Sequence, residues 1–226
     1  ARTVEVLEDL YGQPVSEGTI VEACQETARQ VEWVYQLTKT ELTHPQETGH
    51  FDETGSRING KLGWLHVVCT VLLTYYAVHR KRGRKALDEI GIFPVFKGKA
   101  VHDNYCSYFQ YDQVSHALCN AHHLRDLIFV RDQYQQTWAA EMITLLLEIK
   151  TAVEEAQPEQ QSLLPTQLTE FETRYAAILA AGLPTCPVLE TLEPVPKKRG
   201  KPKQHPVKNL LDHLQARKNE TLAFMY

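Results

Sequence analysis

The stretch GHFDETGSRINGKLGWLHV, residues 49 to 67, decides the fold because it sets two adjacent carboxylates, Asp52 and Glu53, inside a run with strand character. Phe51 precedes the two acids, and the turn-like segment 54–56 follows them. Asp favours turns and caps, so a role in a turn is one interpretation of Asp52. A metal ligand at the end of a buried strand is the alternative.

The residues around this stretch predict three consecutive strands. The first passes through Phe51 and Asp52, and the next two cover 64–70 and 73–78, which indicates an antiparallel meander. The 17 residues from Leu62 to Val78 carry no charged side chain, which approaches the lower limit for a membrane span. Their β-branched and aromatic residues favour two buried strands instead, so we expect no membrane partner.

The following segments alternate between helix and strand patterns. RGRKALDEIG predicts a short helix that Gly91 terminates, and GKAVHDNY predicts a strand that ends at Asp103. VSHALCN indicates another strand, and residues 122–156 are strongly helical. The predicted order is therefore β-β-β-α-β-α-β, followed by helices.

This order predicts an α/β protein with a ribonuclease-H-like mixed sheet, flanking helices and a largely helical insertion. In that fold one acidic residue lies on the first strand and another at the end of the fourth, and these strands are neighbours. Asp52 and Asp103, 51 positions apart, would then meet across one edge of the sheet. Two nearby carboxylates repel each other unless a proton or cation intervenes, and they suit Mg²⁺.

The N-terminal region predicts one long helix. Pro14 to Ser16 form a start signal, and a helical spacing of apolar residues ends before Pro45. We expect this helix to pack by one face. SEGTIVEAC also resembles the second helix of a helix-turn-helix, but no first helix is evident, which favours core packing.

The C-terminal third combines helices with a proline-rich linker. LPTQLTEFETRYAAILAAG predicts a helix stopped by Gly182, residues 184–206 predict an extended linker, and 207–226 predict a last helix running to the end of the chain. The predicted domains are an N-terminal helical region at 1–48, a partial ribonuclease-H-like catalytic core at 49–130, a helical insertion and Pro/Lys-rich linker at 131–205, and a C-terminal helix, cut short, at 206–226.

Composition indicates an intracellular protein, and the charge distribution does not exclude a polyanionic partner. Five scattered cysteines without a CxxC pair favour a reducing, cytoplasmic setting. The net charge of -4 conceals two basic clusters, and phosphate binding depends on local clusters. Solvated loops are the alternative interpretation of these clusters. The candidate DNA-binding residues are Arg80, Lys81, Arg82, Arg84, Lys85, Lys197, Lys198, Arg199, Lys201 and Lys203.

Six segments of the sequence form a recognisable combination: HFDETGSRINGKLGWLHV, LTYYAVHRKRGRKALDEIG, VHDNYCSYFQY, HALCNAHHLRDL, LYGQPVSEGTI and WAAEMITLLLEIK. Together they resemble the transposase family of insertion sequence 66, within the DDE superfamily. The resemblance covers nearly the whole chain. It implies that Asp52 and Asp103 are the first two acids of a catalytic triad that holds two Mg²⁺ (or Mn²⁺) ions.

The resemblance also implies an activity and its partners. Water, and then a freed 3′-hydroxyl, would attack phosphodiester bonds of transposon ends and target DNA in a bacterial cytoplasm, within a homo-oligomeric assembly. The family's third acid follows an Asn-Asn-x-Ala-Glu stretch, which this sequence lacks. Glu141, Glu148 and Glu154 are the candidates to replace this third acid, because they lie on a predicted helix at roughly the right place along the chain. The alternative is a catalytically inactive remnant that binds DNA or an intact transposase.

Cys119 and His122 form a Cys-x2-His pair after the predicted fifth strand. By the resemblance, this pair supports the site structurally. A zinc site needs about four ligands, and no partner pair lies nearby in the sequence, so a buried thiol and a helix-start imidazole are favoured over zinc. We expect Glu53 to support the site indirectly or to be solvated.

Overall fold

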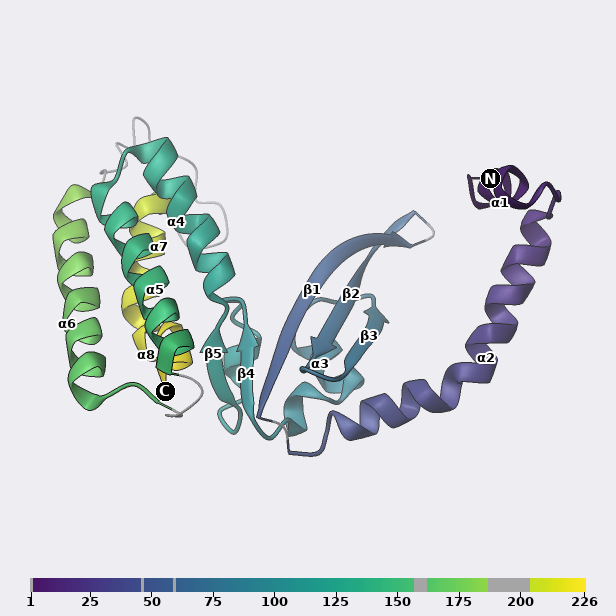
Figure 1. The fold of residues 1–226 in the computed structure, drawn as a ribbon, viewed down its shortest axis with the longest axis horizontal. Coiled ribbons are helices and arrows are strands. Elements are labelled where there is room, and N and C mark those ends of the chain that lie inside the picture. Colours follow the sequence, from purple (N-terminus) through teal and green to yellow (C-terminus); the bar gives the residue numbers. More distant parts are fainter. Residues whose placement is uncertain (1, 46, 59, 157–161, 187–203) are drawn as a thin grey trace, which may run out of the picture. The chain divides into compact units, whose positions relative to one another are not determined.

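The computed structural model describes residues 2–45, 47–58, 60–156, 162–186 and 204–226. Its sheet has five strands in the order β3-β2-β1-β4-β5, as Figure 1 shows. The strands are β1 (Thr48–Ile58), β2 (Lys61–Cys69), β3 (Thr74–His79), β4 (Lys99–His102) and β5 (Ser115–Leu118). The predicted α/β class, with a mixed sheet and flanking helices, is confirmed.

The strand pairing makes neighbours of the two strands that lead to Asp52 and Asp103, as expected. β2 and β3 pair antiparallel, whereas β4 runs parallel to β1 and β5 runs parallel to β4. Between β1 and β4 the paired residues are Thr48 with Lys99, Gly49 with Ala100, and His50 with Val101. The predicted first and fourth strands are therefore neighbours.

The chain divides into two compact units. The first comprises residues 1–47 and 53–97, and the second comprises residues 48–52 and 98–226. The division falls inside β1, so Asp52 belongs to the second unit together with Asp103, whereas Glu53 belongs to the first.

The first unit carries two helices ahead of its strands and one after them. They are α1 (Arg2–Tyr11), α2 (Glu17–Glu41) and α3 (Arg84–Ile90). The predicted N-terminal helix is confirmed as α2, with Ser16 as its N-cap, and Gly91 ends α3 in a left-handed conformation as predicted.

Two expectations about the N-terminal helix are corrected. A helix, α1, does precede α2, although the sequence pattern gives no clear sign of it. Neither helix contains a buried residue, so the expected packing of α2 into a core is wrong. The C-terminal half of α2 does touch β3, where the rings of Tyr35 and Tyr75 stack with centroids 4.6 Å apart.

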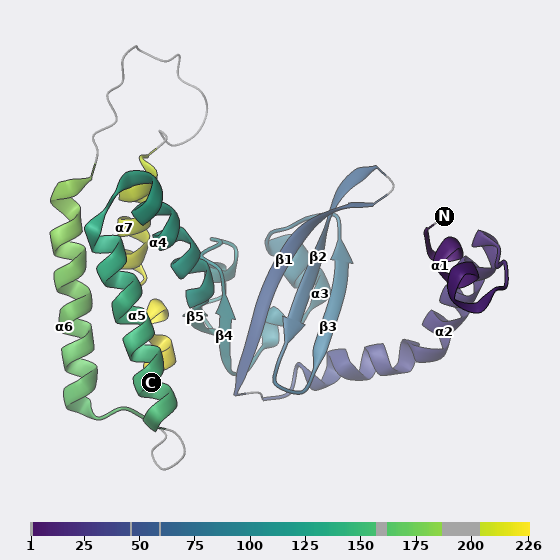
Figure 2. The same cartoon turned by 45° about the horizontal axis from the view of Figure 1, so that its top comes forward.

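The second unit is built mainly from helices. They are α4 (Asn120–Tyr134), α5 (Thr137–Ala156), α6 (Pro165–Gly182), α7 (Pro206–Ala216) and α8 (Lys218–Thr221). Figure 1 and Figure 2 both show α5, α6 and α7 lying side by side. The apolar faces of α4 to α7 enclose one core that includes Trp138, Met142, Leu145, Ile149, Tyr175 and Leu211.

The second unit departs from the predicted element order at three places. A single 3-10 turn, Tyr108–Gln110, replaces the helix expected between β4 and β5. The helical segment 122–156 is two helices, because Gln135 takes a left-handed conformation. The last helix, predicted at 207–226, is divided into α7, which ends at Ala216, and the short α8, and Lys99 binds the carbonyl oxygens of Ala223 and Tyr226 beyond them.

Two other expectations concern the linker and the membrane. Most of the linker predicted at 184–206 lies outside the described residues. No helix in the described ranges is long and apolar enough to cross a membrane.

Candidate active site

Asp52 and Asp103 lie on, or directly after, two neighbouring parallel strands. Asp52 is an exposed residue within β1, and Asp103 is the half-buried residue that follows β4. The observed pairing of these strands stops at His50 and Val101. Continued by two residues, the same register sets Asp52 opposite Asp103, on strands that are about 4.8 Å apart.

A cavity of about 490 Å³ lies on one face of the sheet, and Asp52 and Asp103 belong to the same face. Thr48, His50, Lys99 and Val101 all line it, and they alternate along β1 and β4 with residues of the other face. Side chains two positions apart share a face, so Asp52 and Asp103 continue the same row. Helix α5 contributes Leu146, Leu147 and Lys150 to this cavity.

The glutamates considered as a third acid lie on α5 but do not line the cavity. Glu148 accepts a hydrogen bond from Arg174 at 2.5 Å, and Glu154 pairs with Lys150 at 2.7 Å. Glu141 is exposed. Among the described residues, no three His, Cys, Asp or Glu side chains lie close enough together to hold a metal ion.

Local hydrogen bonds fix the conformation of Asp103. The backbone N–H of Tyr105 donates to Oδ1 of Asp103 at 2.9 Å, which forms an Asx turn. This turn takes the chain out of β4 directly after the acid. The carboxylate is therefore tied to its own loop, as well as to the strand position that presents it.

Two histidines that sequence reasoning did not single out lie behind Asp103. Nδ1 of His102 lies 2.5 Å from the carbonyl oxygen of Asp103, and Nε2 of His102 lies 2.8 Å from Nδ1 of His116. Nε2 of His116 lies 3.1 Å from the carbonyl oxygen of Tyr111. The ring of His102 stacks on Tyr108 at a centroid distance of 4.4 Å.

The contacts of this histidine pair require more protons than two neutral rings carry. A carbonyl oxygen only accepts, so Nδ1 of His102 and Nε2 of His116 must each be protonated. The contact between the other two nitrogens needs a third proton. Burial opposes that charge, because it lowers the pKa of His102 to about 4 and lowers the pKa of His116.

The strand pattern contains a signal for this pair. In the observed register His116 lies opposite Ala100, two residues before His102, so both histidines fall on the face opposite Val101. Two histidines on one face of adjacent strands indicate a possible contact. Without the register, both are ordinary strand residues.

The buried carboxylate of Glu53 forms an ion pair with the partly exposed Arg82 in the first unit. Nε of Arg82 donates to its Oε1 at 2.5 Å, and the Glu53 side chain is 1% exposed. The guanidinium also lies over the ring of Trp64, 5.2 Å from its centroid. Glu53 is therefore not solvated, and Arg82 is held by a carboxylate.

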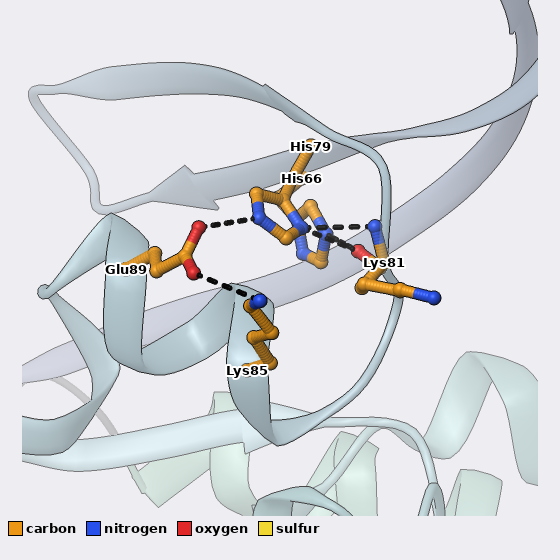
Figure 3. A network of polar contacts seen from close by, with 5 residues as sticks. All are labelled: His66, His79, Lys81, Lys85 and Glu89. Atoms are coloured by element: carbon orange, nitrogen blue, oxygen red, sulfur yellow. Dashed lines mark hydrogen bonds and ion pairs between the residues drawn. The ribbon is translucent and has the colours of Figure 1, made fainter.

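The first basic cluster comprises residues 80–85. Its other cations lie in the loop before α3 and in the first turn of that helix. Figure 3 shows Lys85 and His79 approaching the two carboxylate oxygens of Glu89, at 3.7 Å and 2.8 Å. The backbone N–H of Lys81 donates to Nδ1 of His79, so Nε2 of His79 donates to Glu89. This hydrogen bond lowers the pKa of Glu89 and anchors the segment that carries the cluster.

The cations of this cluster differ in whether a carboxylate lies next to them. Arg84 lies 3.7 Å from Asp88 in an exposed pair. Arg80 and Lys81 are exposed and make no side-chain ion pair within the described part of the chain. The predicted DNA-binding residues Lys197, Lys198, Arg199, Lys201 and Lys203 lie outside the described residues.

Cys119 and His122 lie at the start of α4. Cys119 is the N-cap residue and lines the cavity, and its backbone N–H donates to the carbonyl oxygen of His102 at 2.8 Å. Nδ1 of His122 is buried and has no hydrogen-bond partner among the described residues. The structure gives this pair no further metal ligand there.

Comparison with known proteins relates the whole chain to one family. The model of the family described as "Transposase IS66 family" matches residues 1–226. No curated protein matches the chain. The chain is also similar to a chain in the cryo-EM structure of the simian T-cell lymphotropic virus intasome in complex with PP2A regulatory subunit B56 gamma, at 11% identity and a TM-score of 0.26. That similarity covers 71% of this chain and 61% of that chain.

Proposed function

Because the chain belongs to the transposase family of insertion sequence 66, we propose that it is the catalytic-domain portion of a DNA transposase. The reaction proposed is metal-dependent cleavage of phosphodiester bonds and strand transfer during transposition. The observation that supports it best is the parallel pairing of β1 with β4, whose register leads Asp52 toward Asp103.

The donor chemistry of this pair fits a hard divalent cation. Carboxylate oxygens are the ligands that Mg²⁺ and Mn²⁺ prefer, and a cation relieves the repulsion between two neighbouring acids. Asp52 and Asp103 would hold the metal. When bound, two such ions activate the attacking oxygen and stabilise the leaving oxygen of a phosphodiester.

DNA is the proposed partner, as transposon ends and as target. The exposed cations Arg80 and Lys81, with Arg84 and Lys85 beside them, suit the phosphate backbone, which contributes affinity without reading bases. Assembly of several copies on the DNA is proposed as well.

A second candidate is a catalytically inactive remnant that binds DNA or an intact transposase. One observation favours it: the described residues bring no third acid to Asp52 and Asp103. This candidate predicts DNA binding without any cleavage.

A nicking assay on supercoiled plasmid, with Mg²⁺ and then Mn²⁺, tests the proposal. We expect Asp52→Asn and Asp103→Asn each to lower the nicking rate about 100-fold or more, because each removes a metal-binding charge. Asp112→Asn, which alters an exposed acid of the same unit, is the matched control. Equal nicking by all four proteins would contradict the roles of Asp52 and Asp103. DNA binding without nicking by the wild-type protein would favour the remnant.

A further inference from the structure

A buried polar arrangement behind the sheet fixes the peptide group of Asp103. His102 is 1% exposed and lies between the carbonyl oxygen of Asp103 and the ring of His116. Tyr108 stacks on one side of the His102 ring, and Phe109 meets it edge-on at 5.1 Å. The ring is thus enclosed by two aromatic side chains and has a polar atom within 2.8 Å of each nitrogen.

This arrangement contacts the backbone oxygen of Asp103, whereas the Asx turn involves its side chain. The hydrogen bond from Nδ1 of His102 sets the orientation of the peptide between residues 103 and 104. That orientation decides whether the N–H of Tyr105 reaches Oδ1 of Asp103, which it does at 2.9 Å. The carbonyl and the carboxylate of one residue are therefore fixed by two separate donors.

The second histidine fixes the first. Nδ1 of His116 lies 2.8 Å from Nε2 of His102, and Nε2 of His116 lies 3.1 Å from the carbonyl oxygen of Tyr111. Its ring also packs on Phe109, at a centroid distance of 5.0 Å. A side chain locked at both ends holds its neighbour more closely than one that is free to rotate.

We propose that His102, oriented by His116, is a positioning residue that holds the Asp103 carboxylate in place for metal binding. The proposal rests on the proposed function, because it concerns the same Asp103. It adds that the support comes from the face of the sheet opposite the acids.

Two isosteric variants separate the two bonds that His102 makes. The amide nitrogen of Asn occupies the place of Nδ1, so His102→Asn keeps a donor toward Asp103 and loses the bond to His116. The amide nitrogen of Gln occupies the place of Nε2, so His102→Gln keeps the bond to His116 and loses the donor toward Asp103. His116→Phe keeps a ring next to His102 and removes its nitrogens.

Amide hydrogen exchange measured by NMR reports the position of Asp103 without any metal. In His102→Gln we expect the Tyr105 amide to exchange about tenfold faster than in the wild type, because the Asx turn opens more often. In His102→Asn we expect exchange within about threefold of the wild type. We expect His116→Phe to accelerate it by an intermediate factor.

The Cys119 amide is the internal control for this measurement. It bonds the carbonyl oxygen of His102 in the pairing of β4 with β5, so its exchange reports whether the strands remain joined. A merely structural role would accelerate both amides together. The proposal would be overturned if the ratio of the Tyr105 exchange rate to the Cys119 exchange rate were the same in the wild type and in all variants.

Mn²⁺ binding followed by electron paramagnetic resonance links the positioning to the metal. We expect His102→Gln to weaken Mn²⁺ binding about tenfold and His102→Asn to keep it within about threefold, since residues that orient a ligand commonly contribute this much. Wild-type protein that binds no Mn²⁺ would contradict the proposed function, and the metal part of this proposal with it. Unequal Tyr105 exchange in that case would still establish that His102 positions Asp103. Equal Mn²⁺ affinity in wild type and His102→Gln would overturn the link to the metal.

Discussion

The helices of the two units differ in burial although both have apolar residues at helical spacing. In the second unit, α4 to α7 enclose a core in which Met142, Leu145 and Ile149 are 0% exposed. In the first unit α1 and α2 bury no residue, and Val31 remains 47% exposed. Periodicity therefore predicts where a helix forms, whereas burial depends on what lies against it.

The largest expected effect lies in the first unit, at the ion pair of the buried Glu53 with Arg82. Arg82→Met removes the guanidinium that lies 2.5 Å from the Glu53 carboxylate, and we expect a loss of about 4 kcal/mol in the free energy of unfolding. Arg84→Met is the matched control, since Arg84 is exposed. Urea unfolding followed by circular dichroism measures both. Similar losses in the two variants would show that the pair of Glu53 with Arg82 contributes little.

The comparison of the helices is tested by truncating one residue in each. We expect Leu145→Ala to lower the free energy of unfolding by about 3 kcal/mol, because it leaves a cavity in a closed core. We expect Val31→Ala to change it by less than about 0.5 kcal/mol, as at other exposed sites. Guanidinium unfolding measures the two values. A large loss in Val31→Ala would mean that this face of α2 is covered in solution.

Acid should destabilise the second unit through its buried histidines. Burial lowers the pKa of His123 to about 4, below its ordinary value of 6.5. Between pH 6.5 and 4 the unfolded chain therefore binds more protons than the folded one, and stability falls as the pH falls. For His123 alone we expect about 2 kcal/mol, measured as the difference in urea stability between pH 7 and pH 4.5. His123→Gln should reduce that difference, and an unchanged one would contradict the assignment.

The smallest expected effect concerns the exposed cations of the first unit. We expect the double variant Arg80→Ala and Lys81→Ala to reduce the slope of log affinity for duplex DNA against log salt by about 2, because each cation that neutralises one phosphate contributes about one to this slope. Arg131→Ala is the control, since Arg131 is paired with Asp132. Fluorescence anisotropy across salt concentrations measures the slope. An equal slope in the wild type and the double variant would remove these two residues from the DNA interface.

The strand order and most helices can be predicted because short-range patterns determine them. The alternation around Asp52 and the glycine after α3 are local signals. Gly182 shows the limit of such reasoning. Helix α6 ends at this residue, as the sequence pattern predicts, but the backbone of Gly182 is right-handed and an added Cβ would lie 2.8 Å from Cγ of Trp138. Its role is close packing, which depends on a residue 44 positions away.

The candidate site is predictable only in part. The order of the strands along the chain indicates that Asp52 and Asp103 lie close together, and the resemblance to the transposase family implies their role. The histidine pair and the bond between Glu53 and Arg82 depend on register and on the folding of a loop. A basic run gives no sign of which of its members a buried acid will hold, so the sequence alone groups Arg82 with the exposed cations.

The alternation within β1 has a consequence for how this strand can change during evolution. Asp52 is exposed, whereas its neighbour Glu53 is buried against Arg82. Inserting or deleting one residue between Thr48 and Asp52 would exchange the environments of the two acids. A point substitution in this segment changes one side chain only, whereas a change of one residue in its length moves every following side chain to the other face of the sheet. Homologous chains should therefore keep a constant number of residues between Thr48 and Asp52, even where the residues between these two positions differ.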